Sequence, residues 1–312
     1  MLRRNLCYDL KKNICSVNFL LACTAVFMLI LITNCVVYDG STPNYSFPGF
    51  VLNTDRSFWQ SSILYSRFNM FLRGFSSQWL AYFLPILTGI SCVPMLCDEI
   101  NSNNFRMVCV RGNIRSYITS KFICAFITAS LTVIIPYIIF GIFCYFTFPP
   151  TESYREMLTE IHAPRGIAGQ EQLNALFSNK SWPLNALFDT NSGWVFLTGK
   201  LLLTSAYAAL PCLLTMVMAA LTLNKFVSMA FPVMICFGVS QVLINAISKA
   251  SENSESIGFW QFFEFQGRFY RFESEFEETV HLPTSFIFAY IVLALILLYF
   301  VFEAILNRKL RV

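Results

Sequence analysis

Charged residues are scarce in this chain. Only 13% of its 312 residues are Asp, Glu, Lys or Arg, whereas 56% are hydrophobic and the mean hydropathy is +0.57. Soluble globular domains carry roughly a quarter charged residues, so this composition excludes the soluble enzyme classes. A disordered chain is excluded as well, because 33 Phe, 13 Tyr and 5 Trp would expose too much apolar surface to stay solvated. The chain is expected to be an all-α integral membrane protein.

The chain has few histidines, and its long loops have no cysteine, although metal sites and disulfides depend on these residues. The two histidines, His162 and His281, stand alone, and none of the 11 cysteines falls in the long loops expected outside the membrane. No cysteine pair has zinc-ligand spacing, so we expect neither a metal site nor disulfides in those loops. The run Glu277-Glu278-x-x-His281 lacks a second histidine and is interpreted as a solvated acidic face. No catalytic residue is predicted.

Long apolar runs are abundant. A bilayer core about 30 Å thick needs roughly 20 apolar residues in a helix. Six runs satisfy this and predict a single transmembrane domain with spans over residues 17–38, 79–97, 122–148, 194–223, 226–247 and 284–306. The first is interpreted as a retained span and not a cleaved signal peptide. Prolines inside the second to fifth runs predict bends that neighbouring helices would compensate: Pro85, Pro94, Pro136, Pro211 and Pro232.

The positive charges predict the orientation. If both termini are cytoplasmic, the inner segments hold twelve Lys and Arg residues, whereas the much longer outer loops hold nine together with fourteen of the eighteen acids. The positive-inside rule therefore predicts cytoplasmic termini and extracellular loops over residues 39–78, 149–193 and 248–283. The predicted location is a bacterial plasma membrane, crossed several times.

The first residues of the chain combine apolar and basic side chains. Leu2, Leu6, Leu10 and Ile14 recur at a spacing of four, which places them on one helical face. Residues 1–15 are predicted to form an amphipathic helix on the inner leaflet, although an unstructured basic anchor stays an alternative. Its basic residues are predicted to meet the membrane interface: Arg3, Arg4, Lys11 and Lys12.

Two outer loops are rich in aromatic residues. Within residues 57–79 we expect an interfacial helix that turns Trp59, Phe68, Phe71 and Phe75 toward lipid or the bundle. The loop 248–283 mixes acids with a dense aromatic cluster that is too polar to cross the membrane and too aromatic to stay in water. It is predicted either to anchor the loop at the interface or to form an outer gate, with Trp260, Phe262, Phe263 and Phe269.

Residues 98–121 form the only sizeable cytoplasmic connection of this layout. Asp98 and Glu99 open it, and residues 101–110 predict a short helix that ends near Arg111 and Gly112. Tyr117 and Lys121 follow, an aromatic and a cation placed where the third span enters the headgroup region.

In this arrangement the chain resembles the membrane (permease) subunits of ABC transporters of the type 2 exporter class. The shared parts are the amphipathic N-terminal helix, six spans, an acidic residue closing the second span, a coupling helix, and an extra-membrane element before the sixth span. The second outer loop, about 45 residues long, departs from this pattern. The resemblance implies that a separate ATPase grips the coupling helix through Glu99, Asn103, Asn104, Phe105, Arg106, Met107 and Arg111.

The ATPase must be another chain, because no G-x-x-x-x-G-K-[ST] loop occurs here. This chain would therefore be the non-catalytic subunit, with no cofactor of its own, and ATP and Mg bound by the partner. The other expected partners are a second permease, identical or related, and membrane lipid; no nucleic acid is expected.

The predicted function is ATP-driven export of an amphipathic or hydrophobic substrate, a lipid or a peptide, with antimicrobial-peptide export or immunity as one role by family analogy. An ion-driven transporter is disfavoured because the spans hold almost no ionisable side chains, and Lys200 and Glu303 lie near span ends. A non-transporting receptor, channel or assembly scaffold stays the alternative.

Overall fold

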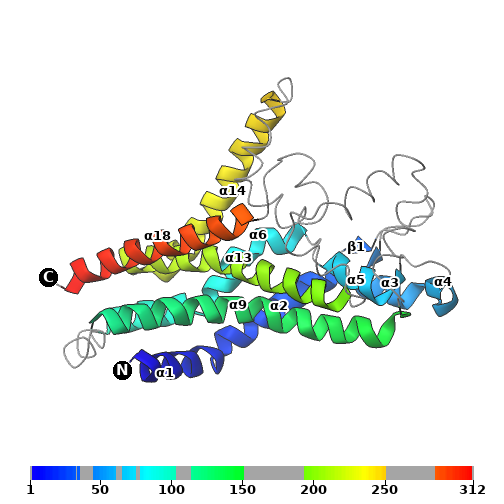
Figure 1. Cartoon of the computed structure of the whole chain (residues 1–312), viewed down its shortest axis with the longest axis horizontal. Helices are drawn as coiled ribbons and strands as arrows, with labels where there is room; N and C mark the ends of the chain where they lie inside the picture. The colour runs from blue at the N-terminus through cyan, green and yellow to red at the C-terminus, as the bar shows by residue number, and fades with distance from the viewer. Residues whose placement is uncertain are drawn as a thin grey trace.

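The computed structural model of the chain describes residues 2–32, 34–35, 45–60, 65–74, 78–102, 114–150, 193–250 and 285–310. These residues are almost entirely helical, which confirms the predicted helical class for this part of the chain (Figure 1). Two short strands, β1 (Asn34–Cys35) and β2 (Tyr45–Ser46), pair antiparallel, with Asn34 opposite Ser46.

The N-terminal helix and the first apolar helix meet at a bend. α1 (Leu2–Ile14) and α2 (Val17–Ile32) are inclined by 59°. Ser16 stabilises the break because its Oγ donates to the Asn13 carbonyl at 2.6 Å and accepts from the Phe19 amide at 3.2 Å, as a helix N-cap does. The predicted first span, 17–38, is too long for this helix, since α2 ends at Ile32. Asn34 is a poor helix former and lies in a strand instead.

A second break divides the second predicted span. α6 (Gln78–Ile90) and α7 (Val93–Asn101) are inclined by 47°, and Pro94 stands in the first turn of α7, where its missing amide hydrogen costs no helical hydrogen bond. The helices containing Pro85, Pro136, Pro211 and Pro232 continue through the proline.

The longest helices form the centre of the bundle. α9 (Ile114–Thr147) packs against α13 (Gly193–Thr222), and these two contact most of the other helices. α14 (Lys225–Ala250) and α18 (Ser285–Leu310) follow. Within the described residues, three helices are long and apolar enough to cross a membrane, or five if each bent pair is one span. Six crossings therefore stay a prediction.

Figure 1 shows both ends of the chain at the same end of the bundle, beside the start of α9. We call this the charged end, because its residues 98–102 and 114–121 carry ion pairs. The opposite end, the aromatic end, holds α3 (Phe47–Asn53), α4 (Arg56–Gln60) and α5 (Arg67–Gly74).

The aromatic end has its own apolar core. The Phe47 and Phe140 rings meet edge to face at 4.8 Å, and the Trp59 and Phe148 rings lie 5.3 Å apart. The interfacial helix predicted in residues 57–79 is represented by α4 and α5. Trp59, Phe68 and Phe71 are buried and so turn toward the bundle, whereas Phe75 lies outside the described residues.

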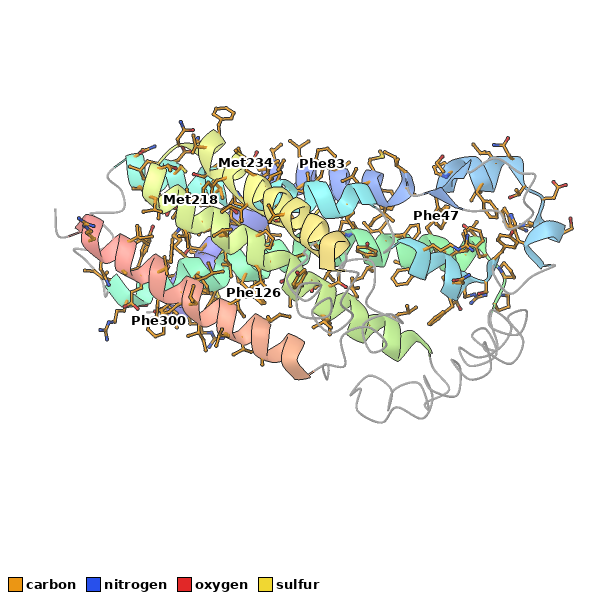
Figure 2. All side chains as sticks on the ribbon, turned by 90° about the horizontal axis from the view of Figure 1, so that it is seen from above. Phe47, Phe83, Phe126, Met218, Met234 and Phe300 are labelled. Carbon is orange, nitrogen blue, oxygen red and sulfur yellow. The ribbon has the colours of Figure 1, made fainter. Side chains whose placement is uncertain are left out.

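Apolar side chains also cover the outside of the bundle. Phe83, Met234 and Phe300 point outward in Figure 2, and 43%, 71% and 61% of their surfaces are exposed. An exposed apolar surface of this extent fits a hydrocarbon environment and not water. The described helices are thus those of a membrane-embedded protein.

Candidate functional site

The site is a charged cluster where α1, α7 and α9 meet. Residues 103–113 connect α7 to α9, and the cluster takes residues from both of these helices. It consists of Asp9, Lys12, Glu99, Tyr117, Ser120 and Lys121. The apolar run of α7 ends at Cys97, and the apolar run of α9 begins at Phe122, so these groups lie just beyond the segments expected to cross the membrane. Each of the three helices contributes at least one charged group.

Glu99 receives donors from two other helices. Its Oε2 lies 2.6 Å from Lys121 Nζ and 2.9 Å from the Tyr117 hydroxyl, and its Oε1 lies 3.0 Å from Lys12 Nζ. Burial acts to raise the pKa of Glu99, but the Lys121 ammonium and three hydrogen bonds outweigh it, so this pKa lies below its usual value. Glu99 is therefore an ionised carboxylate that joins α7 to α1 and α9.

Lys121 joins Glu99 to the N-terminal helix. Its Nζ lies 2.8 Å from Asp9 Oδ1, and Ser120 donates to Asp9 Oδ2 at 2.8 Å. Lys121 and Asp9 are both buried, with 7% and 5% of their surfaces exposed. The cluster has two acids and two lysines, so its charges balance. Removing Lys121 would leave the buried Asp9 carboxylate without its cation, which is strongly destabilising.

The polar side of α1 packs against the bundle. Asp9 and Asn13, four residues apart, are the buried residues of this helix, and Asn13 Nδ2 donates to Cys124 Sγ at 3.2 Å. Leu2 and Ile14, from the predicted apolar face, are exposed instead. The cluster and Cys124 thus position α1 on α9 through polar contacts.

Other contacts extend the cluster to the remaining helices at the charged end. Lys225 Nζ of α14 lies 2.6 Å from Asp98 Oδ1, and Asn101 Nδ2 donates to the Leu223 carbonyl at 3.5 Å. On the other flank of the connection, Arg115 Nε lies 3.5 Å from Glu303 Oε1 of α18. Both flanks of residues 103–113 are therefore tied to other helices.

The structure brings together only part of the predicted site. Glu99, Lys12, Tyr117 and Lys121 meet in the charged cluster, and the lysines contact carboxylates. Arg3, Arg4 and Lys11 lie exposed on α1. The other predicted coupling residues lie outside the described residues, as do those of the predicted outer gate: Asn103, Asn104, Phe105, Arg106, Met107 and Arg111, and Trp260, Phe262, Phe263 and Phe269.

The sequence interpretation missed Asp9 and Ser120, and it noted Glu303 only as a residue near a span end, without its ion pair to Arg115. A signal for Asp9 was present, since Asn5, Asp9 and Asn13 repeat at a spacing of four and form a polar stripe along the helix. No comparable pattern marks Ser120 or Glu303, whose roles depend on which helices lie beside them. Among the residues that the structure describes, no group of three His, Cys, Asp or Glu side chains could hold a metal ion.

Comparisons with protein families, with curated proteins and with solved structures found no match to this chain. The class that the structure defines is a helical membrane protein with a charged cluster at one end of its bundle.

Proposed function

We propose that this chain is the membrane subunit of an ATP-driven exporter, and that a separate ATPase acts on the connection 103–113. The supporting observation is that Asp98, Glu99 and Arg115, which flank this connection, are joined by ion pairs to α1, α9, α14 and α18. A displacement of the connection would therefore be shared among these helix ends at once. Networks of ion pairs and packed side chains such as this one can carry coupling between helices.

The charged end is proposed to face the cytoplasm of a bacterial cell, where an ATPase could reach it. The chain would pair with itself or a related permease and with two ATPase chains that bind ATP and Mg. The exposed apolar face of α18, which includes Leu293, Leu297 and Phe300, is available for lipid or for the second permease.

The cargo is proposed to be amphipathic or hydrophobic, a lipid or a peptide. Several buried hydroxyls of the bundle donate their protons within their own helices, so these protons are not available to a polar ligand. Thr88, Thr128 and Thr215 donate to the carbonyls of Leu84, Cys124 and Pro211, each at 2.8 Å. An ion or a sugar would need converging polar groups, whereas an apolar cargo would not.

The test is purification of the tagged full-length protein from its native membrane. We expect a chain with an ATP-binding loop to co-elute, and the joint change Phe105→Ala with Arg106→Ala to release it. The joint change Asp55→Ala with Arg56→Ala is the matched control, because both residues are exposed at the aromatic end. An ATPase that stays bound to the first variant would contradict the proposed coupling role.

A further inference from the structure

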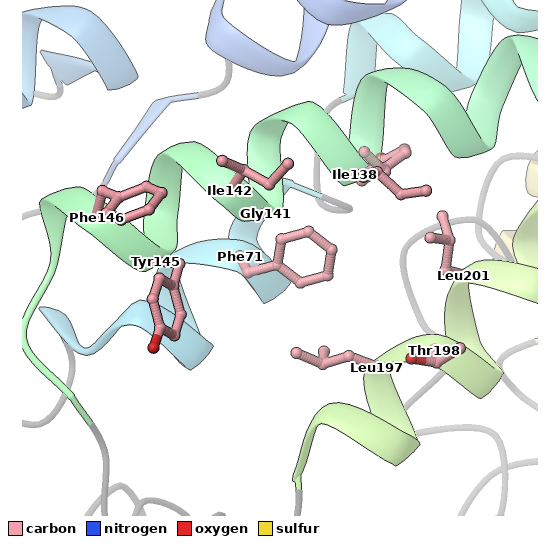
Figure 3. A pocket seen from close by; sticks show the side chains of 10 residues that line it. Phe71, Ile138, Gly141, Ile142, Tyr145, Phe146, Leu197, Thr198 and Leu201 are labelled. Carbon is pink, nitrogen blue, oxygen red and sulfur yellow. The ribbon is translucent and has the colours of Figure 1, made fainter.

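The aromatic end contains an apolar pocket between α5, α9 and α13 (Figure 3). Its volume is about 590 Å³, within the range of roughly 300 to 1,000 Å³ typical of small-molecule sites. Phe71 of α5 and Gly141 of α9 line it, and Leu197, Thr198 and Leu201 of α13 face Ile138, Ile142 and Tyr145 of α9. Ile142 and Tyr145 are half exposed, so the pocket is open at the surface of the bundle.

The pocket extends along α9. Ile138 and Leu201 lie at one end of it, and Tyr145 lies at the other (Figure 3). Tyr145 follows Ile138 by seven positions on α9, which corresponds to about 10 Å of helix. The Tyr145 end lies near the last turn of α9, where a spanning helix would reach the headgroup region.

A cation lies beside the Tyr145 end, although it does not itself line the pocket. The Arg67 guanidinium carbon lies 4.4 Å from the centre of the Tyr145 ring, and the Arg67 amide donates to the Pro149 carbonyl at 3.0 Å, which fixes α5 beside the end of α9. Among the described residues, the buried Nε of Arg67 has no hydrogen-bond partner and no carboxylate forms an ion pair with this arginine. A partly buried guanidinium without an anion is an incomplete site.

We propose that this pocket binds one acyl chain of an anionic phospholipid, with the phosphate at Arg67. The apolar walls match the chain, and the position of the cation matches the head group of a lipid that stands in the bilayer with its ordinary orientation. An arginine binds phosphate oxygens through charge-assisted hydrogen bonds. This site requires only that the helices lie in a membrane, and it is independent of any ATPase.

The experiment uses the purified full-length protein and phosphatidylglycerol that carries a photoactivatable diazirine in one acyl chain. We expect crosslinks to residues 138–146 and 197–201, and about tenfold weaker labelling by phosphatidylcholine with the same chains, the effect of one lost charge-assisted contact. Arg67→Gln should reduce phosphatidylglycerol labelling to the phosphatidylcholine level.

Two variants fill the pocket from opposite walls, Ile142→Trp and Thr198→Trp, and each should abolish labelling. Ile139→Trp is the matched control, because Ile139 is half exposed on the same helix but does not line the pocket. Thermal unfolding in detergent identifies a variant that fails to fold, and the other pocket variant then decides. Equal labelling of pocket and control variants would overturn the proposal, as would an unchanged lipid preference in Arg67→Gln. Native mass spectrometry that shows a hydrophobic peptide bound to the unmodified protein and absent from both pocket variants would overturn it too.

Discussion

Replacing Lys121 by Met should loosen the N-terminal helix from the bundle. The Lys121 ammonium lies 2.6 Å from a Glu99 oxygen and 2.8 Å from an Asp9 oxygen, and methionine keeps the length of the side chain without its charge. The carboxylates of Asp9 and Glu99 would then share a single remaining lysine, Lys12, which among the described residues pairs only with Glu99. Asp9 would keep a single hydrogen bond, from Ser120.

The expected loss of stability is about 3 kcal/mol. Removing one partner of a buried ion pair costs roughly 3 to 5 kcal/mol, and the lower end applies because Lys12 and Tyr117 still serve Glu99. Solvent does little to screen this pair, since the side chains of Lys121 and Asp9 are 9% and 7% exposed. A loss of this size corresponds to more than a hundredfold change in an equilibrium constant.

Cysteine chemistry can report the release of α1. Cys124 is buried, and Asn13 of α1 covers it with a contact of 3.2 Å. In Lys121→Met, labelling of Cys124 by N-ethylmaleimide should rise severalfold, measured peptide by peptide with mass spectrometry. Cys7, exposed on α1, serves as the internal reference. The midpoint of thermal unfolding in detergent should fall in parallel.

Lys225→Met is the matched control. Its ion pair with Asp98 is as short, at 2.6 Å, but the two side chains are 40% and 64% exposed, and an exposed pair contributes about 0 to 1 kcal/mol. Adding Asp9→Asn to Lys121→Met should restore part of the stability, because the unpaired carboxylate disappears. If Lys121→Met unfolds at the temperature of Lys225→Met and Cys124 stays protected, the reasoning about a buried ion pair is refuted.

Three further changes test other parts of the structure. Gly74→Ala should lower the unfolding midpoint by an amount equivalent to about 1 to 3 kcal/mol, because its Cβ would lie 2.5 Å from the buried Phe140 ring, whereas Gly238→Ala, with open space around it, should not. Asn224→Ala should cost about 1 kcal/mol in the same assay, because the Asn224 side chain caps α14 by accepting from the amides of residues 226 and 227 at 3.0 and 3.3 Å. If the chain has the proposed exporter function, Glu99→Lys should abolish ATP-driven export in vesicles and Glu303→Lys should only weaken it; equal export by both variants would remove Glu99 from the coupling role.

The helices were largely predictable because hydropathy reports directly on them. The third to sixth apolar runs correspond to α9, α13, α14 and α18, since a span must keep its hydrogen bonds within one helix. Their ends were less predictable. α9 begins at Ile114, eight residues before the apolar run, because ion pairs and Tyr117 stabilise a polar extension of the helix that hydropathy does not register.

The partners of the charged cluster were not predictable from spacing alone. Glu99, Tyr117 and Lys121 were identified by their positions beside the connection, but Asp9 lies more than one hundred residues away from Lys121. The many basic residues among the first 15 indicated an interfacial helix, so the one acidic residue there, Asp9, received no separate interpretation. The Asp9–Lys121 ion pair forms because α1 lies along α9. This placement depends on the 59° bend between α1 and α2 and not on any local sequence pattern.

The length of α9 has a mechanical consequence. At 34 residues this helix is about 51 Å long, well beyond the roughly 30 Å of a bilayer core, and it continues without a break from Lys121 to the aromatic rings around Gly141. Pro136 is the point at which it lacks a hydrogen bond and bends most easily. A change of tilt imposed at Lys121 therefore either sweeps Gly141 sideways against Phe71 or is absorbed at Pro136. The stiffness of α9 and the position of Pro136 therefore determine how much of a displacement at the charged end reaches the aromatic end.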